Sequence, residues 1–380
     1  MKIRAAVLRE MGKKRPYYES KPLVIEEIEL SKPKINEILV KVHAAGLCHS
    51  DLSVIDGNRP RQLPMVLGHE AAGEVIEIGS NVRDISVGDH VVFTFVPICG
   101  HCQPCMTAHP ALCENGAIAN SNGVLLDGGT RLSDNHKHQI HHHMGISGFA
   151  EHVVVSRQSV VKINQKLPFD IAALFGCAVI TGVGAVINTG NLKLGETVLI
   201  TGLGGVGFAA LLGAIAGGAS KVIVADVNKE KLSKAIEMGA HEAIDLLEKT
   251  ALEKIQDLTG GGVDVGFEFA GVINALEFTY NATVRGGRTI TAGLPHPSMM
   301  IQISATKLVA EEKTLKGSYL GRCIPTRDIP AYIALYLSGR LPVDKLMTHK
   351  IQLDEINTAF ERLAEGKAIR QIIGFNEANK

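Results

Sequence analysis

The chain has 380 residues, 46% of them hydrophobic and 21% charged, a composition that is ordinary for a folded globular protein and excludes a largely disordered one. This length is more than one hydrophobic core usually fills, so two domains are expected. Lys plus Arg and Asp plus Glu each number 39, and this balance argues against nucleic acid or an anionic membrane surface as a partner.

The first third of the chain predicts an antiparallel, barrel-like β domain. Its short runs of β-branched residues are separated by Gly, Pro and Asn, as strands are by turns. The expected strands are Ile3–Leu8, Leu23–Leu30, Glu37–Ala44, Ala72–Ile78 and His90–Phe95. Further along, the segment from Arg131 to Gly145 is rich in histidine (NHKHQIHHH, residues 135–143, with every histidine in 136–143), but the spacing is irregular, so a surface lobe is favoured over a metal-buffering tract.

From about Thr197 onward, strands and helices are predicted to alternate, which is typical of a parallel doubly wound sheet. The expected strands are Thr197–Ile200, Lys221–Ala225, Val263–Phe269 and Arg288–Ala292, and the expected helices are Val206–Gly217, Lys229–Met238, Thr250–Leu258 and Asn274–Thr283. The tail adds helices near Asp328–Ser338 and Asp354–Ala364 and a strand near Gln371–Phe375.

A glycine loop lies between the first strand and helix of this alternation. Gly202, Gly204 and Gly207 form G-x-G-x-x-G, with Gly205 and Val206 between them. The first glycine permits a turn, the second lets the backbone approach a pyrophosphate, and the third lets helix and strand pack closely. Asp226 ends the next strand, where a carboxylate accepts hydrogen bonds from the ribose of NAD and repels the 2′-phosphate of NADP. The alternative is a structural glycine-rich turn.

Four of the seven cysteines lie within fifteen residues, in Cys99-x-x-Cys102-x-x-Cys105-x7-Cys113. Nothing at the N-terminus resembles a signal peptide, and no uninterrupted apolar run reaches the roughly 18 residues of a membrane span, so a cytoplasmic location is expected. A reducing compartment disfavours disulfides. A ferredoxin-like cluster needs its fourth cysteine sooner and a proline after it. A structural zinc site with four ligands and no open position is therefore predicted.

A second set of candidate ligands is dispersed along the chain. Cys48 lies in GLCHSD, His69 and Glu70 in GHE, and Cys177 in FGCAVITG. Taken singly, each residue has a structural interpretation, since buried cysteines pack as small hydrophobic residues. Taken together, two thiolates and an imidazole are a ligand set that leaves one zinc position open for substrate. Spacing alone does not bring these residues together.

With these motifs in place, the sequence resembles the zinc-containing medium-chain alcohol dehydrogenase family over nearly its whole length. The matching segments include GLCHSD, GHEAAGEV, VGDHVV, CGHCQPC, FGCAVITG, TGLGGVGFAA and ADVNKEK. The resemblance implies a GroES-like β-barrel catalytic domain with a structural zinc lobe, formed by residues 1–178 and 321–380. It also implies an NAD-binding Rossmann domain over residues 179–320.

The resemblance also implies roles for individual residues. The catalytic zinc ligands would be Cys48, His69 and Cys177, with Glu70 as an acid that can approach the metal. Ser50 would bond the substrate oxygen and Asp51 would hold the ligand histidine. The coenzyme would contact His49 and Arg370 at the pyrophosphate, Asp226 and Lys231 near the ribose, and Thr181 and Val206 at the nicotinamide. Phe95 and Phe149 would line the substrate pocket.

The sequence departs from the family pattern at several positions. Ser53 stands where a histidine often ends the proton relay, so the relay is expected to end in water or at His49. Arg59 stands where an apolar pocket wall is common. Gly57, Arg59 and Gly116 replace the charged residues of the branch that acts on glutathione adducts, so that specificity is not expected.

The sequence therefore predicts a zinc-dependent, NAD-linked alcohol dehydrogenase with two zinc ions per chain, one catalytic and one structural. Its partner would be a small alcohol, aldehyde or ketone, with neither nucleic acid nor membrane. The alternatives are a zinc-free quinone or enoyl reductase of the same architecture, or a non-enzymatic zinc-stabilised NAD-binding protein. The apolar run Ser298–Ser304 predicts a homodimer, because it follows the last expected Rossmann strand and would cover an open sheet edge.

Overall fold

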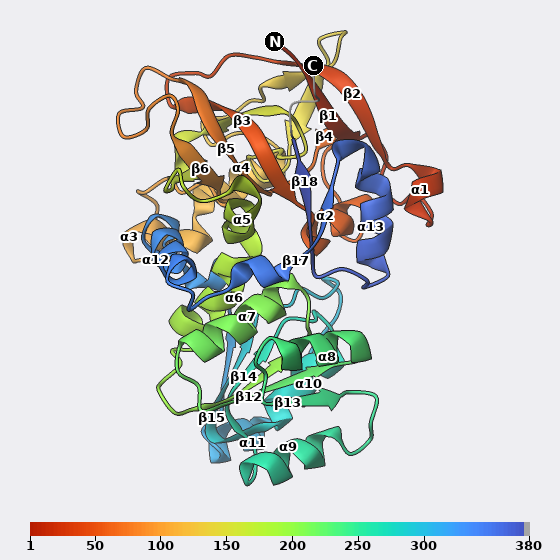
Figure 1. Cartoon of the computed structure of the whole chain (residues 1–380), viewed down its shortest axis with the longest axis vertical. Helices are drawn as coiled ribbons and strands as arrows, with labels where there is room; N and C mark the ends of the chain where they lie inside the picture. Colours follow the sequence, from red (N-terminus) through yellow and green to blue (C-terminus); the bar gives the residue numbers. More distant parts are fainter. Residues whose placement is uncertain (376–380) are drawn as a thin grey trace. The chain divides into compact units, whose positions relative to one another are not determined.

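A computed structural model describes residues 1–375, and the chain divides into two compact units (Figure 1). The barrel unit comprises Met1–Cys177, Ile324–Pro330 and the described residues from Met347 onward. The sheet unit comprises Ala178–Cys323 and Ala331–Leu346. The stretch 331–346 therefore belongs to the sheet unit, whereas it was predicted from the sequence to belong to the catalytic domain. Its Ile333, Leu341 and Val343 are buried.

The barrel unit contains a small closed barrel. Its strands follow the order β1 (Lys2–Leu8), β2 (Leu23–Leu30), β7 (Leu132–Ser133), β8 (Gln139–His142) and β4 (Met65–Val66). Strand β8 runs parallel to β4, with His142 in register with Val66. The residues that follow these two strands therefore leave the barrel at the same end, and those residues include His69 and His143.

A second sheet in the same unit has the order β10 (Val160–Lys162), β6 (His90–Phe93), β5 (Glu70–Ile78), β3 (Glu37–Gly46), β18 (Arg370–Gly374) and β17 (Met347–Ile351), with β9 (His152–Ser156) also paired to β3. At the end of β3, Gly46 is in register with Glu70 on one side and with Ile372 on the other. This register brings residues from the beginning and the end of the chain to one place, immediately before Cys48.

Short helices complete the barrel unit: α1 (Tyr17–Ser20), α2 (His49–Ile55), α3 (Gln103–Met106), α4 (Glu114–Asn122), α5 (Phe169–Leu174) and α13 (Ile356–Ala364). Helix α13 buries Ile356, Ala359, Phe360 and Leu363, the spacing of one apolar helix face. Glu361 on this helix accepts hydrogen bonds from the Arg15 guanidinium and the Tyr17 N–H, which fixes the N-terminal segment on α13.

The sheet unit is a doubly wound parallel sheet. Its strand order is β13 (Glu242–Asp245), β12 (Lys221–Asp226), β11 (Thr197–Thr201), β14 (Val263–Glu268), β15 (Thr283–Thr291) and β16 (Thr314–Gly317). This is the 3-2-1-4-5-6 order of a Rossmann fold. The middle of the central strand β11 is apolar, and its Val198, Leu199 and Ile200 are fully buried. The helices are α6 (Ile180–Gly184), α7 (Gly205–Ala216), α8 (Lys229–Glu237), α9 (Ala251–Thr259), α10 (Ile273–Asn281), α11 (Ala305–Ala310) and the C-terminal part of α12 (Pro325–Leu337).

The expected end of this sheet differs from the structure. Ser298–Ser304 has no regular secondary structure, and the edge next to β15 is occupied by β16. Met299 and Met300 in that segment are 54% and 80% exposed. The apolar run therefore does not form the last strand of its own sheet, and its side chains remain on the surface of the unit.

A long helical stretch, Phe169–Thr189, contains the last candidate zinc ligand. Two π-helical turns interrupt it, at Phe175–Val179 and Ala185–Thr189. The stretch is apolar and long enough to span a membrane by length and composition alone, but 83% of its most apolar window is buried inside the protein, as in a core helix. π-Turns are frequent at functional sites, and Cys177 lies in the first of them.

Candidate functional site

Three dispersed side chains of the barrel unit meet in its interior. Cys48 is the N-cap of α2, His69 immediately precedes β5, and Cys177 lies in the π-helical turn. The Sγ atoms of Cys48 and Cys177 are 4.0 Å apart, and the His69 Nε2 lies 3.3 Å from the Cys177 Sγ. All three residues are buried. The structure thus brings together the set that the sequence could only suggest.

The geometry of these donor atoms fits a zinc ion. A tetrahedral ion with Zn–S bonds near 2.3 Å and Zn–N bonds near 2.0–2.1 Å separates two sulfurs by about 3.8 Å and a sulfur from a nitrogen by about 3.6 Å. The observed separations lie within about 0.3 Å of these values. Two thiols and an imidazole supply three ligands, so a fourth position would remain for a substrate oxygen.

The electrostatics favour an ionised thiol in this group. A hydrogen bond from the Cys177 thiol holds the pKa of Cys48 well below its usual range, and the Arg370 guanidinium adds to this effect. The same hydrogen bond, together with burial, raises the pKa of Cys177. Of the two thiols, Cys48 therefore has the lower pKa, and a thiolate is the form in which cysteine binds a metal ion.

Asp51 connects the site to its surroundings through a fully buried carboxylate. Its Oδ2 accepts the Cys48 N–H at 3.2 Å, and its Oδ1 accepts the Gly68 N–H at 3.1 Å. The same Oδ1 lies 3.1 Å from the His69 Nδ1, which is the orientation expected of a partner that fixes a ligand histidine. Burial opposes ionisation, but the His69 and His143 rings hold the pKa of Asp51 at about 2.

His143 was not among the site residues predicted from the sequence, although its side chain is at this site. His143 is fully buried, and its Nδ1 lies 3.1 Å from the Asp51 Oδ1. Its ring also meets the His69 ring edge-on, with centroids 5.6 Å apart. The run of three histidines at 141–143 was a signal, but in the sequence nothing distinguished the third from the other histidines of the same tract.

The other residues of the GLCHSD motif occupy the first turns of α2. The Ser50 hydroxyl lies 3.9 Å from the Cys48 Sγ and is half-buried, whereas His49 is exposed at the start of the helix. The Ser53 hydroxyl donates to the His49 carbonyl at 2.9 Å. Ser53 is thus occupied by a local helix contact, and no proton path through it is indicated.

Two aromatic side chains were expected to line the pocket. The Phe95 ring meets the His69 ring edge-on, with centroids 5.5 Å apart, so it contacts the candidate ligand set. Phe149 is fully buried and packs against Phe360 in the core of the barrel unit. A pocket-wall role for Phe149 stays a prediction.

Glu70 and Arg370 lie beside the ligand set as a buried pair. The Glu70 carboxylate is 3.6 Å from the Arg370 guanidinium, which also donates to the Leu47 carbonyl at 3.0 Å. Glu70 is outside the group of atoms that lie within 4.8 Å of one another. Burial raises the pKa of Glu70 to about 7, which is consistent with an acid that is not permanently charged. Arg370 is buried within this unit, and its role at a pyrophosphate stays a prediction.

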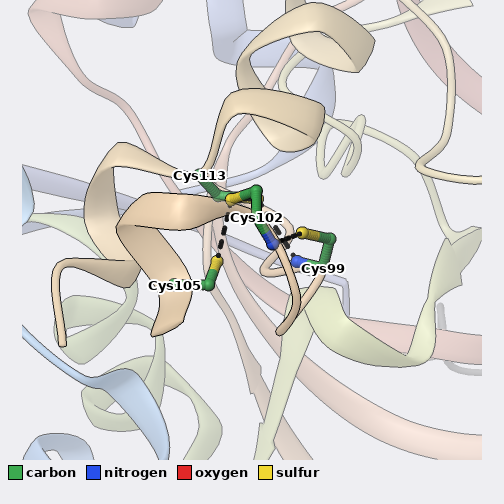
Figure 2. A group of neighbouring side chains, drawn as sticks. All are labelled: Cys99, Cys102, Cys105 and Cys113. Atoms are coloured by element: carbon green, nitrogen blue, oxygen red, sulfur yellow. Dashed lines mark hydrogen bonds between the residues drawn. The ribbon is translucent and has the colours of Figure 1, made fainter. Parts of the chain in front are cut away.

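The four clustered cysteines converge on one point (Figure 2). The Cys102 Sγ lies 3.4 Å from the Cys105 Sγ and 3.9 Å from the Cys113 Sγ, close to the sulfur–sulfur distance of a tetrahedral zinc site. Backbone N–H groups of Cys102 and Gly116 point at the sulfurs of Cys99 and Cys113. Although burial opposes it, such N–H groups lower the pKa of Cys99 to about 6. All seven cysteines are free, so the disulfide alternative is wrong.

The glycine loop of the sheet unit has the geometry that its motif predicts. Gly202 has φ +93°, and a Cβ there would lie 2.5 Å from the Ala270 nitrogen. A Cβ on Gly207 would lie 1.9 Å from the Gly202 carbonyl oxygen, so only glycine allows helix and strand to pack. Gly204, the N-cap of α7, has open space around its Cβ position, as a phosphate-facing residue requires. Gly205 and Val206 begin α7 behind it.

Asp226 is linked to this loop directly. Its Oδ2 accepts the Leu203 N–H at 2.6 Å, and its Oδ1 accepts the Asn228 N–H at 2.9 Å. The acid thus orders the glycine loop, a contact that the sequence did not reveal. Lys231 lies in the first turn of α8, where Asn228 caps its N–H, and the Thr181 hydroxyl is buried with no hydrogen-bond partner among residues 1–375.

Comparison with known proteins agrees with both units. Residues 34–165 match the alcohol dehydrogenase GroES-like domain, and residues 205–338 match the zinc-binding dehydrogenase family. The chain is 37% identical to the class-3 alcohol dehydrogenase of Drosophila melanogaster, over 93% of this chain and 95% of that protein.

Solved structures show the same architecture. An alcohol dehydrogenase zinc-binding domain protein from Burkholderia ambifaria aligns with a TM-score of 0.93 at 33% identity, covering 99% of this chain and all of that one. The benzyl alcohol dehydrogenase of Acinetobacter calcoaceticus aligns with a TM-score of 0.92 at 31% identity, with the same coverage. The fold, the ligand sets and these relatives together place the chain in the zinc-containing medium-chain alcohol dehydrogenase family.

Proposed function

We propose that the protein catalyses reversible hydride transfer between a primary or secondary alcohol and NAD, giving an aldehyde or ketone. The observation that carries the proposal is the convergence of Cys48, His69 and Cys177 inside the barrel unit, at distances suited to one zinc with an open position. The glycine loop and Asp226 of the sheet unit supply a dinucleotide site. A zinc-free reductase would not require the three-ligand set, and a non-enzymatic protein would not require a zinc position that is open to substrate.

The chemistry divides between cofactors and side chains. When bound, zinc would supply a Lewis acid that lowers the pKa of an alcohol hydroxyl, and NAD a hydride acceptor. Asp51 orients the His69 ring through its Nδ1, so that Nε2 faces the two thiols. The Ser50 Oγ is placed beside Cys48, where it can take up the hydroxyl proton. The Phe95 ring packs edge-on against the His69 ring and would give the site an apolar wall.

The four-cysteine cluster would hold a second, structural zinc. Its four sulfurs leave no position for substrate, so this metal would stabilise the lobe formed by α3 and α4 rather than take part in the reaction. Each chain would then bind two zinc ions. In the same lobe, a Cβ on Gly116 would lie 2.2 Å from the Pro97 carbonyl, so this position has no room for the arginine of the glutathione-adduct branch.

The preference for NAD follows from Asp226. Its carboxylate lies at the end of β12 against the glycine loop, where it would accept the ribose hydroxyls of NAD and repel a 2′-phosphate. Lys231, in the adjacent helix, would lie near the same ribose. Because the substrates named for the relatives include benzyl alcohol, aromatic primary alcohols belong among the substrates to be tested.

We also propose a homodimer in the cytoplasm. The exposed apolar segment Ser298–Ser304 is free of regular structure in the single chain, and Met299 and Met300 project from it. Pairing with the same segment of a second copy would cover these side chains and give a closed two-fold assembly. Tetrameric members of the family tend to have a shorter segment after the zinc cysteines, so the long stretch Glu114–Gly148 favours two subunits over four.

The test is oxidation of a panel of primary, secondary and aromatic alcohols, followed by the absorbance of reduced coenzyme with NAD and with NADP. Cys177→Ser should abolish turnover with every alcohol. Cys323→Ser is the matched control, because Cys323 is equally buried but contacts the Ile180 carbonyl and Tyr332 in the sheet unit. Turnover that survives Cys177→Ser, or no oxidation of any alcohol by the zinc-loaded protein, would rule the proposal out.

A further inference from the structure

The fully buried His143 stands out among residues 1–375, because neither of its ring nitrogens has a well-aligned hydrogen-bond partner there. If this side chain served only to fill space in the core, phenylalanine would give a more stable folded state, since buried polar atoms without partners are destabilising. The nearest charged atom is the Asp51 Oδ1, 3.1 Å from the His143 Nδ1. The imidazole is therefore directed at a carboxylate, and this calls for a functional explanation.

We propose that His143 is a second positioning residue for the catalytic zinc, acting through the Asp51 carboxylate on the ligand His69. The proposal rests on the proposed function of the Cys48–His69–Cys177 site. It assigns to the histidine tract a role in the reaction, which the surface-lobe interpretation did not.

The chain places His143 there through the barrel. Strands β4 and β8 are parallel, with Val66 opposite His142. One residue further, the backbone N–H of His143 donates to the Val66 carbonyl at 3.3 Å, which connects the end of β8 to the segment that leads to His69. After His143 the chain turns sharply, with Met144 and Ser147 at positive φ. The His143 ring is thereby held at the end of the barrel where the segment from β4 to His69 begins.

The Asp51 Oδ1 is surrounded by three nitrogens, each 3.1 Å away: the Gly68 backbone N–H, the His69 Nδ1 and the His143 Nδ1. A carboxylate has no proton to give, so each facing nitrogen must carry the hydrogen. For His69 this leaves Nε2 unprotonated toward the thiols, as a zinc ligand must be. For His143 it leaves Nε2 as a buried acceptor. Two imidazoles thus share one oxygen from nearly perpendicular planes.

This arrangement restricts the movement of the carboxylate. The Cys48 N–H holds Oδ2, and the three nitrogens hold Oδ1. If the His143 contact is lost, Oδ1 keeps two nitrogen contacts instead of three, so the carboxylate and the His69 ring that it orients are held less firmly relative to the two sulfurs. Partners that orient a ligand histidine typically change metal affinity by about tenfold to a hundredfold. Because Asp51 keeps its direct contact with His69, we expect the lower end of this range.

The experiment replaces His143 and measures metal binding rather than turnover. The zinc at the three-ligand site is removed with a chelator, the protein is checked to retain one zinc per chain, and Co²⁺ is titrated in. His143→Phe should bind Co²⁺ about tenfold more weakly and shift the ligand-field bands. His143→Asn, whose amide N–H can replace the Nδ1–H, should restore both. His143→Gln, whose amide reaches the Nε2 position instead, should behave as His143→Phe does.

The matched control is His142→Phe. His142 is equally buried, but its Nε2 accepts the Arg131 N–H at 3.1 Å and its Nδ1 pairs with the Ser147 hydroxyl, away from Asp51. This variant should lose thermal stability and keep the cobalt affinity and spectrum. The proposal is overturned if His143→Gln matches the wild type, or if His143→Asn is as impaired as His143→Phe. If the wild type itself gives no thiolate–cobalt bands, the proposed function fails first and this proposal falls with it.

Discussion

Replacing Asp226 with serine tests whether one carboxylate both selects the coenzyme and orders the glycine loop. In the structure, its two oxygens accept the Leu203 and Asn228 N–H groups. A hydrogen bond to a charged group contributes about 1.5–3 kcal/mol, and Leu203 is fully buried, so water cannot replace the bond that its N–H loses. Asn228 is half-buried, so its N–H can be solvated. We expect Asp226→Ser to lower the free energy of unfolding by about 2–3 kcal/mol.

The same change should alter the choice of coenzyme. Loss of the ribose bonds and of the repulsion toward a 2′-phosphate together correspond to about 2–4 kcal/mol, so the NAD-to-NADP ratio of kcat/KM should fall by about 30-fold to about 1,000-fold. Stability is measured by urea unfolding without coenzyme, and the ratio by initial rates with a saturating alcohol.

Asp245→Ser provides the control for this pair of measurements. Asp245 ends the neighbouring strand β13 and accepts a similar local N–H, from Leu247 at 2.9 Å, but it does not contact the glycine loop. Leu247 is 71% exposed, so water can take over that bond, and we expect a loss below about 1 kcal/mol with no change in coenzyme preference. Equal kcat/KM for NAD and NADP in the wild type would refute the coenzyme argument. A stability of Asp226→Ser equal to that of Asp245→Ser would refute the loop argument.

Three further predictions concern other parts of the chain. A hydrogen bond from Arg15 lowers the pKa of Glu361, so the pair stabilises the fold above the unfolded pKa of this acid, and the stabilisation is lost as the pH falls through the lower folded pKa. Glu361→Gln should therefore flatten the decline of Tm between neutral and acid pH. An unchanged decline would contradict this. His49→Arg keeps a positive charge but cannot exchange protons near pH 7, so a changed pH profile of kcat would place the proton exit at His49, whereas an identical profile would assign it to water. Light scattering should give the mass of two chains, and Ile301→Asp should dissociate the dimer or prevent soluble expression. A wild-type mass near one chain would contradict the proposed dimer. A mass near four chains would contradict the inference drawn from the length of Glu114–Gly148.

A motif could be predicted from the sequence where its geometry is set by residues within one short segment. The glycine loop is such a case, because the absence of a side chain at Gly202 and Gly207 is visible in the sequence and the structure shows why no other residue fits. The four-cysteine lobe is another, because the short spacings between its cysteines are those with which a few tight turns bring four thiols to one zinc ion. The strands β2 and β12 were likewise recognisable from β-branched runs bounded by turns.

Features that depend on long-range packing were not predictable in the same way. The convergence of Cys48, His69 and Cys177 depends on strand register and on a π-helical turn, and residue spacing encodes neither. His143 looked like part of an irregular surface tract, and only the parallel pairing of β4 with β8 brings it to Asp51. Ser298–Ser304 had the composition of a strand, but the edge that it was expected to occupy is taken by β16, a less apolar segment further along the chain.

The central claim is that each chain holds two zinc ions with separate roles, and metal content measured alongside activity tests it most directly. The wild type should contain two zinc ions per chain. Cys177→Ser should retain about one, keep its fold and lose all turnover, because only the site with an open position is affected. Cys102→Ser should lose the other zinc and unfold at lower temperature, because a structural site contributes folding free energy. Full activity after complete loss of the Cys48–His69–Cys177 zinc would contradict the account.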